Sequence, residues 1–148
     1  MPPLNVLFET VDALVQQCEA DYELLKNRTI DAVFFEDIQN QRLVNSFLFN
    51  YMKLQDKIGA KLFRAVLWEL REIDDESMPM RDILNRLEKL QLIEDAKAWD
   101  RLREVRNAIA HEYPLDIEER VENIAAAMQG YGLLKTIYAA IRRKVRVQ

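Results

Sequence analysis

The chain has few of the residues that build disulfide-stapled, turn-rich or membrane-spanning proteins. Its 148 residues include one cysteine, three glycines and four prolines. A single cysteine excludes an internal disulfide, and so few turn-forming residues disfavour a turn-rich β architecture. No segment reaches the ~18 consecutive apolar residues of a membrane span, and no basic segment precedes the first apolar residues. We therefore expect a cytoplasmic protein without a membrane partner.

The chain also lacks an excess of positive charge. It has 21 Lys and Arg against 25 Asp and Glu, which gives a net charge of −4. A protein that coats nucleic acid regardless of sequence needs a basic surface, so the composition argues against that class. The composition does not exclude a local basic cleft. The length suits one domain, spanning residues 1–148.

Apolar residues recur at helical spacing along most of the chain, and this pattern predicts five amphipathic helices. Cys18 falls on the apolar stripe of the first helix, where we expect it to pack in the core, and the acidic residues Asp74–Glu76 are expected to lie in a loop. We find no repeat and no domain linker. The sequence predicts an all-α, up-and-down helical bundle. Its helices are expected at about 4–25, 33–71, 83–90, 95–113 and 117–142.

The second predicted helix is unusually long for a domain of this size. At 1.5 Å per residue, the range 33–71 would extend about 60 Å. Two alternatives account for this length: the helix bends near Gly59, or it protrudes and is buried against another chain. The second alternative implies a dimer.

One stretch of the fourth predicted helix holds the only histidine of the chain. It reads Arg106-Asn107-Ala108-Ile109-Ala110-His111-Glu112-Tyr113-Pro114. Proline disfavours helical geometry at the residue before it, so we expect the helix to end at Tyr113.

On a helix, five polar residues of this segment would form two adjacent rows. Arg103, Asn107 and His111 are spaced by four residues and share one edge. Arg106 and Tyr113 are seven residues apart and form the neighbouring row. We therefore expect these side chains to converge on one groove.

Such a set suits the cleavage of RNA without a metal. That reaction needs a base for the 2′-hydroxyl, an acid for the leaving oxygen and positive charge at the phosphate. Histidine can act as base or acid near neutral pH, and arginine binds phosphate through two hydrogen bonds. Asn107 could hold the imidazole of His111 or a phosphate oxygen near Arg106. One histidine cannot supply two imidazoles, but two copies of the chain could.

The segment resembles the R-x4-H-x-Y signature of HEPN-domain ribonucleases, specifically the HepT toxins of HepT/MntA (type VII) toxin–antitoxin pairs. The residues that match are Arg106, Asn107, His111 and Tyr113. The resemblance implies a helical homodimer with a metal-independent, cofactor-free endoribonuclease site at the dimer interface. It implies that Arg106 and His111 are catalytic and that Asn107 supports them.

The resemblance further implies an MntA-like nucleotidyltransferase antitoxin as a partner, which attaches AMP to Tyr113. The added phosphate and bulk would repel RNA and block its access to the site.

Plainer interpretations stand beside these. A histidine in the last turn of a helix is a favourable partner for the helix dipole. Arg103 is either solvated or binds the RNA substrate. The basic tail Arg142–Arg146 either contacts nucleic acid or, as we favour, follows the usual preference for cations at a helix C-terminus. Two other functions also remain open. One is a non-catalytic helical partner, or substrate-binding subunit, of a nucleotidyltransferase. The other is a structural dimer.

Overall fold

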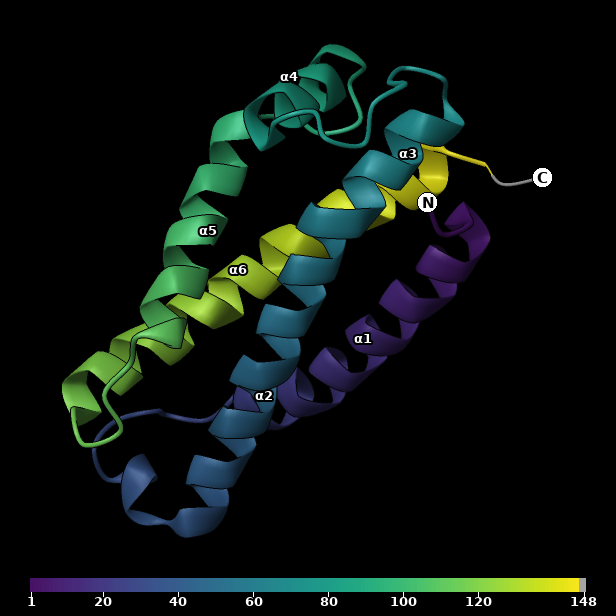
Figure 1. Cartoon of the computed structure of the whole chain (residues 1–148). Helices are drawn as coiled ribbons and strands as arrows, with labels where there is room; N and C mark the ends of the chain where they lie inside the picture. Colours follow the sequence, from purple (N-terminus) through teal and green to yellow (C-terminus); the bar gives the residue numbers. More distant parts are fainter. Residues whose placement is uncertain (147–148) are drawn as a thin grey trace.

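A computed structural model describes residues 1–146, and over that range it contains helices and no strand (Figure 1). The prediction of an all-α fold is confirmed. The α-helices are α1 (Leu4–Leu25), α2 (Ile38–Lys57), α3 (Phe63–Glu69), α4 (Met80–Lys89), α5 (Ala96–Ala110) and α6 (Ile117–Lys144). Two short elements join them: a 3₁₀ turn η1 (Phe34–Glu36) and a π-helical turn η2 (Ile58–Leu62).

The predicted second helix is a chain of consecutive elements. Asp37 begins α2 by accepting a hydrogen bond from the backbone N–H of Gln39 at 2.8 Å. The helix then passes through η2 into α3 without a break and ends at Glu69. A π-helical turn inserts extra backbone into an α-helix and changes the direction of the side chains that follow.

Gly59 lies in the π-helical turn because α5 approaches closely there. A Cβ atom at this position would lie 2.7 Å from Cζ2 of Trp99. The helical segment does not protrude, since α1 packs against α2, η2 and α3. Its length therefore gives no support to a dimer, which stays a prediction.

The other helices lie close to their predicted ranges. The chain turns through α4 at one end of the molecule, and α5 then runs alongside α6 towards the opposite end (Figure 1). Asp74–Glu76 is a loop, as expected. Gly130 permits close packing in α6, since a Cβ there would lie 2.5 Å from the hydroxyl of Tyr51.

One cluster of buried hydrophobic residues joins all the helices. Cys18 is fully buried in it, as predicted, and burial raises the pKa of its thiol to about 12. Phe49 of α2 lies outside this cluster and is 58% exposed. No helix in residues 1–146 is both long enough and apolar enough to span a membrane.

Candidate functional site

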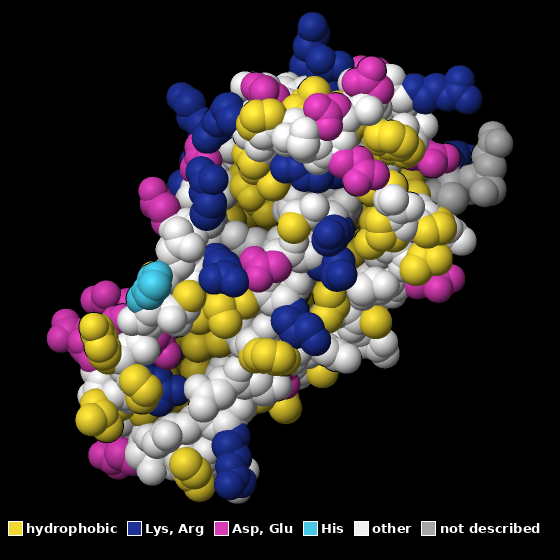
Figure 2. Space-filling model, in the orientation of Figure 1, with side chains coloured by type: hydrophobic (Ala, Val, Ile, Leu, Met, Phe, Trp, Pro, Cys, Tyr) yellow, Lys and Arg dark blue, Asp and Glu magenta, His cyan; other side chains and the backbone are white. Residues whose placement is uncertain are grey.

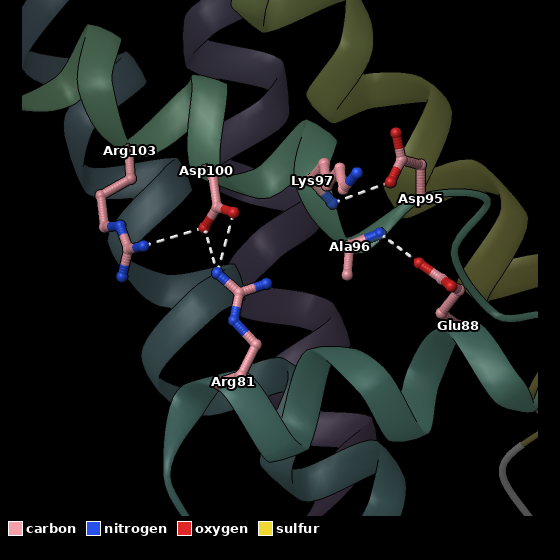
Figure 3. A network of polar contacts seen from close by, with 7 residues as sticks. All are labelled: Arg81, Glu88, Asp95, Ala96, Lys97, Asp100 and Arg103. Carbon is pink, nitrogen blue, oxygen red and sulfur yellow. Dashed lines mark hydrogen bonds and ion pairs between the residues drawn. The ribbon is translucent and has the colours of Figure 1, made fainter.

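The beginning of α5 is fixed by ion pairs. Arg81 of α4 donates from Nη2 to both carboxylate oxygens of Asp100, at 2.7 and 2.8 Å (Figure 3). Arg103 donates to the same carboxylate at 2.8 Å. The arginines lower the pKa of Asp100, with Arg81 as the larger cause. Arg103, predicted to bind substrate, thus forms an ion pair with a carboxylate of its own helix.

The first backbone amides of α5 are also satisfied. Asp95 caps the helix by accepting from the N–H of Lys97 at 2.8 Å. Glu88 of α4 accepts from the N–H of Ala96 at 2.6 Å (Figure 3). These two carboxylates pair with N–H groups that a helix start otherwise leaves without a partner. The start of α5 is therefore held both by its own N-cap and by α4.

Arg106, nearer the other end of α5, is held from a different helix. Its Nε and Nη2 donate to the two oxygens of Asp56 in α2, at 3.1 and 2.9 Å. This fork fixes the plane of the guanidinium and leaves its other N–H groups for a further acceptor. Sequence reasoning missed Asp56, because 50 residues separate it from Arg106 and nothing in the local pattern connects them.

Asn107 and His111 lie one helical turn apart, and both are exposed. The backbone N–H of His111 donates to the carbonyl oxygen of Asn107 at 3.2 Å. Neither side chain forms a hydrogen bond within residues 1–146. The single histidine lies on the face shown in Figure 2, where it is cyan. Arg103, Asn107 and His111 form the predicted row and are exposed, but only Arg103 and Asn107 of this row line a common groove.

The helix ends earlier than predicted, and this moves Tyr113. The last residue of α5 is Ala110, and His111 is its C-cap with φ −105° and ψ 13°. The expectation that Tyr113 follows Arg106 by two turns of the same helix is therefore wrong. Tyr113 lies in the connection to α6, where its side chain is 73% exposed.

A buried ion pair accounts for this early end. The carboxylate of Glu112 accepts from Nδ2 of Asn123 at 3.0 Å and lies 3.5 Å from Nε of Arg120. Arg120 is 5% exposed and donates to Oδ1 of Asn45 in α2 at 2.8 Å. Its guanidinium lies over the ring of Phe35, 4.7 Å from the centroid. The end of α5 is thereby tied to α6, α2 and η1.

The network of Glu112 holds the chain between two predicted site residues, His111 and Tyr113. The side chain of Glu112 turns inward between His111 and Tyr113, and both of these neighbours are exposed. Sequence reasoning missed Glu112 and Arg120. The available signal was a glutamate at the start of a short loop and an arginine in the first turn of the following helix, which is too common a pattern to single out.

A groove of about 420 Å³ lies between the α2–η2 segment and α5. Its polar side chains include those of Gln55, Asp56, Arg106 and Asn107. Gln55 is only 4% exposed, and its amide oxygen has no hydrogen-bond partner among residues 1–146. A buried acceptor left unpaired typically costs about 1–3 kcal/mol. His111 does not line this groove but lies one turn beyond Asn107.

No cluster of three or more His, Cys, Asp or Glu side chains suited to a metal occurs within the described part of the chain. In the acidic loop, Asp75 accepts hydrogen bonds from the backbone and hydroxyl of Ser77 instead.

Comparison of the chain with protein-family models, curated proteins and solved structures gives no match. The resemblance to HEPN ribonucleases therefore stays a prediction from the motif residues.

Proposed function

We propose that this chain is a metal-independent endoribonuclease of the HepT-like HEPN type, acting as a homodimer. One observation carries the proposal: Arg106, Asn107 and His111 all lie within the last turns and the C-cap of α5, with the guanidinium oriented by Asp56 and the imidazole exposed. RNA transesterification needs at least a positively charged side chain that binds the phosphate and, beside it, a group that can transfer protons.

The reaction follows from these groups. An imidazole takes the proton of the ribose 2′-hydroxyl, and the resulting oxygen attacks the adjacent phosphorus. The bond from phosphorus to the 5′-oxygen breaks, and that oxygen takes a proton from a second imidazole. Arg106 stabilises the extra negative charge on the phosphate. The products are a 2′,3′-cyclic phosphate and a 5′-hydroxyl.

A homodimer would supply the second imidazole, because each chain has only His111. An exposed apolar side chain near the site supports a contact between copies. Phe49 is 58% exposed and lies seven residues before Asp56 on α2, a spacing that places both on one face of the helix. Light scattering should give about twice the 17.5 kDa of one chain, and a monomer would remove the shared site.

We propose further that an MntA-like nucleotidyltransferase controls the site through Tyr113. The exposed phenol oxygen attacks the α-phosphorus of ATP, pyrophosphate leaves, and the phenol proton passes to solvent. The AMP adds bulk and negative charge two residues from His111. Incubation with such an enzyme and ATP should add the mass of AMP to the wild type and not to Tyr113→Phe. An adduct on Tyr113→Phe would refute this assignment.

Cleavage of a mixed-sequence RNA in the presence of EDTA tests the catalytic proposal. Wild type should cut, while His111→Ala and Arg106→Ala should lose activity by about 100-fold or more. Arg101→Ala is the matched control, because Arg101 is an exposed arginine on the same helix that does not line the groove. Equal cutting by wild type and His111→Ala would refute the mechanism. Absence of cutting by all variants would favour the non-catalytic partner of a nucleotidyltransferase.

A further inference from the structure

The end of α5 differs from the ends of the two helices before it. α3 and α4 are each followed by a residue with a left-handed backbone, Arg71 with φ 58° and Gln91 with φ 59°. Such a residue turns the chain so that a later N–H bonds one of the last carbonyl oxygens of the helix. After α3, the N–H of Glu72 donates to the carbonyl oxygen of Leu67 at 2.8 Å in this way. No residue in the range 110–117 has a positive φ, so α5 ends without this motif.

A side chain of α6 takes the place of that motif at the end of α5. Nδ2 of Asn123 donates to the carbonyl oxygen of Ala108 at 3.4 Å and to the carboxylate of Glu112 at 3.0 Å. Asn123 is buried, so both hydrogen bonds are made inside the protein. The last backbone hydrogen bonds of the segment come from the N–H groups of His111 and Glu112. Helix ends fray unless they are held, so these two bonds depend on the contact from α6.

The same network continues from α6 to α2. Glu112 lies 3.5 Å from Nε of Arg120, whose Nη2 donates to Oδ1 of Asn45 in α2 at 2.8 Å. Asp56, which binds Arg106 through both oxygens, follows Asn45 by eleven residues on α2. Eleven residues are about three turns of an α-helix, so Asn45 and Asp56 share one face of α2. That face therefore holds Arg106 directly and the end of α5 through Arg120.

We infer that Glu112 is a positioning residue of the candidate site, which fixes the place of His111 relative to Arg106. His111 is the C-cap of α5 and its side chain is exposed, so its backbone determines where the imidazole can reach. That backbone is held one residue later, at the inward carboxylate of Glu112. The consequence for RNA cleavage rests on the proposed function. Misplacing a reacting group by about 1 Å can slow a reaction about 100-fold, so the anchor acts on the rate of the chemical step.

Exchange of backbone amides with water, followed by NMR, tests the anchor without any reaction. Glu112→Gln removes the charge that faces Arg120 and keeps an oxygen that can accept from Asn123. The amide of His111 should exchange about tenfold faster than in wild type, because the last turn of α5 opens more often. The amide of Leu102, in the middle of α5, should change much less. A loss of global stability alone would not single out His111.

Two further variants complete the exchange experiment. Glu118→Gln makes the same chemical change at an exposed glutamate of α6, and the amide of His111 should then exchange as in wild type. Asn45→Ala removes the α2 end of the network at an exposed position, and exchange at His111 should rise a few-fold. Asn45→Ala takes the place of Glu112→Gln if thermal unfolding shows that Glu112→Gln does not fold.

The kinetics of RNA cleavage in EDTA distinguish positioning from general support of the fold. Per folded molecule, Glu112→Gln should lower kcat about tenfold and leave KM unchanged, because the anchor acts on the reacting group and not on RNA binding. Glu118→Gln should match wild type in both constants. A residue that only supported the fold would leave kcat per folded molecule unchanged.

Three results would overturn the inference: unchanged exchange at His111 in the folded variants, an unchanged kcat for folded Glu112→Gln, or an effect confined to KM. Cleavage by wild type together with equal cleavage by folded Glu112→Gln would refute the positioning role alone. Faster exchange at His111 in Glu112→Gln, without cleavage by wild type, would refute the proposed catalysis and leave the anchor of α5 supported.

Discussion

The two ends of α5 differ in how their polar groups are used. At the beginning, the helix is held by Asp95 and Glu88 at its backbone amides and by Arg81 at Asp100 (Figure 3). At the other end, Asn107 and His111 are exposed and make no side-chain hydrogen bonds within residues 1–146. The polar groups at the beginning are paired with one another, while at the other end two exposed side chains stand beside the paired Arg106 and the buried Glu112.

The largest expected difference is in RNA cleavage, between substitutions of two arginines that lie one turn apart on α5. Arg106→Ala removes the guanidinium held by Asp56, and RNA cleavage should fall about 100- to 1,000-fold. Arg103→Ala removes a guanidinium that lies one turn farther from His111 and pairs with Asp100 of its own helix, so the loss of cleavage should be only a few-fold. Initial rates with one RNA measure both. Equal losses would contradict the division between the two ends.

The next effect concerns stability at the end of α5. Glu112→Ala leaves the buried guanidinium of Arg120 without its counter-ion, and the free energy of unfolding should drop by about 3–5 kcal/mol. Urea denaturation measures the change. Glu118→Ala, an exposed glutamate at the start of α6, is the control and should have little effect. A loss below about 1 kcal/mol for Glu112→Ala would show that the network does not hold this corner.

A smaller change in stability is expected at the beginning of α5. Asp95→Ala removes the N-cap of α5, which accepts from the N–H of Lys97, and should lower the free energy of unfolding by about 1 kcal/mol. Asp95→Asn keeps an acceptor and should recover most of that loss. Cleavage by both variants should equal that of wild type at temperatures where they are folded. A large loss of activity would mean that this end takes part in the reaction.

The smallest effect is a dependence of stability on pH. Arg81 and Arg103 lower the pKa of Asp100 below its ordinary value of 3.8 in the folded state. The carboxylate therefore contributes stability above about pH 3.8, and this contribution is lost as the pH falls through the lowered pKa. Asp100→Asn should make the decline of stability between pH 4 and pH 2 less steep, as followed by circular dichroism. An unchanged slope would contradict the ion pair.

The approximate positions of the helices could be predicted from the sequence because apolar spacing is a local signal. The ranges of α1 and α6 follow from it closely, and Asp95 and Asp116 mark helix starts through their own side chains. The exposed row of Asn107 and His111 was predictable for the same reason, since it needs only helical geometry.

The features that were missed depend on residues distant in the sequence or on the chain outside the helix. Asp56 reaches Arg106 across 50 residues. The end of α5 at Ala110 follows from the inward turn of Glu112 towards Arg120 and Asn123, whereas Pro114 alone predicts an end at Tyr113. Pairing across a loop is decided by the packing of α6 on α5, which periodicity does not specify.

The products formed from an RNA with one 2′-deoxynucleotide test the central claim most directly. Wild type in EDTA should leave 2′,3′-cyclic phosphate and 5′-hydroxyl ends at every cut, and should not cut at the linkage that follows the deoxynucleotide. Mass spectrometry of the fragments identifies both. Products with 5′-phosphate ends, or cutting at the deoxy linkage, would contradict a 2′-hydroxyl attack assisted by His111.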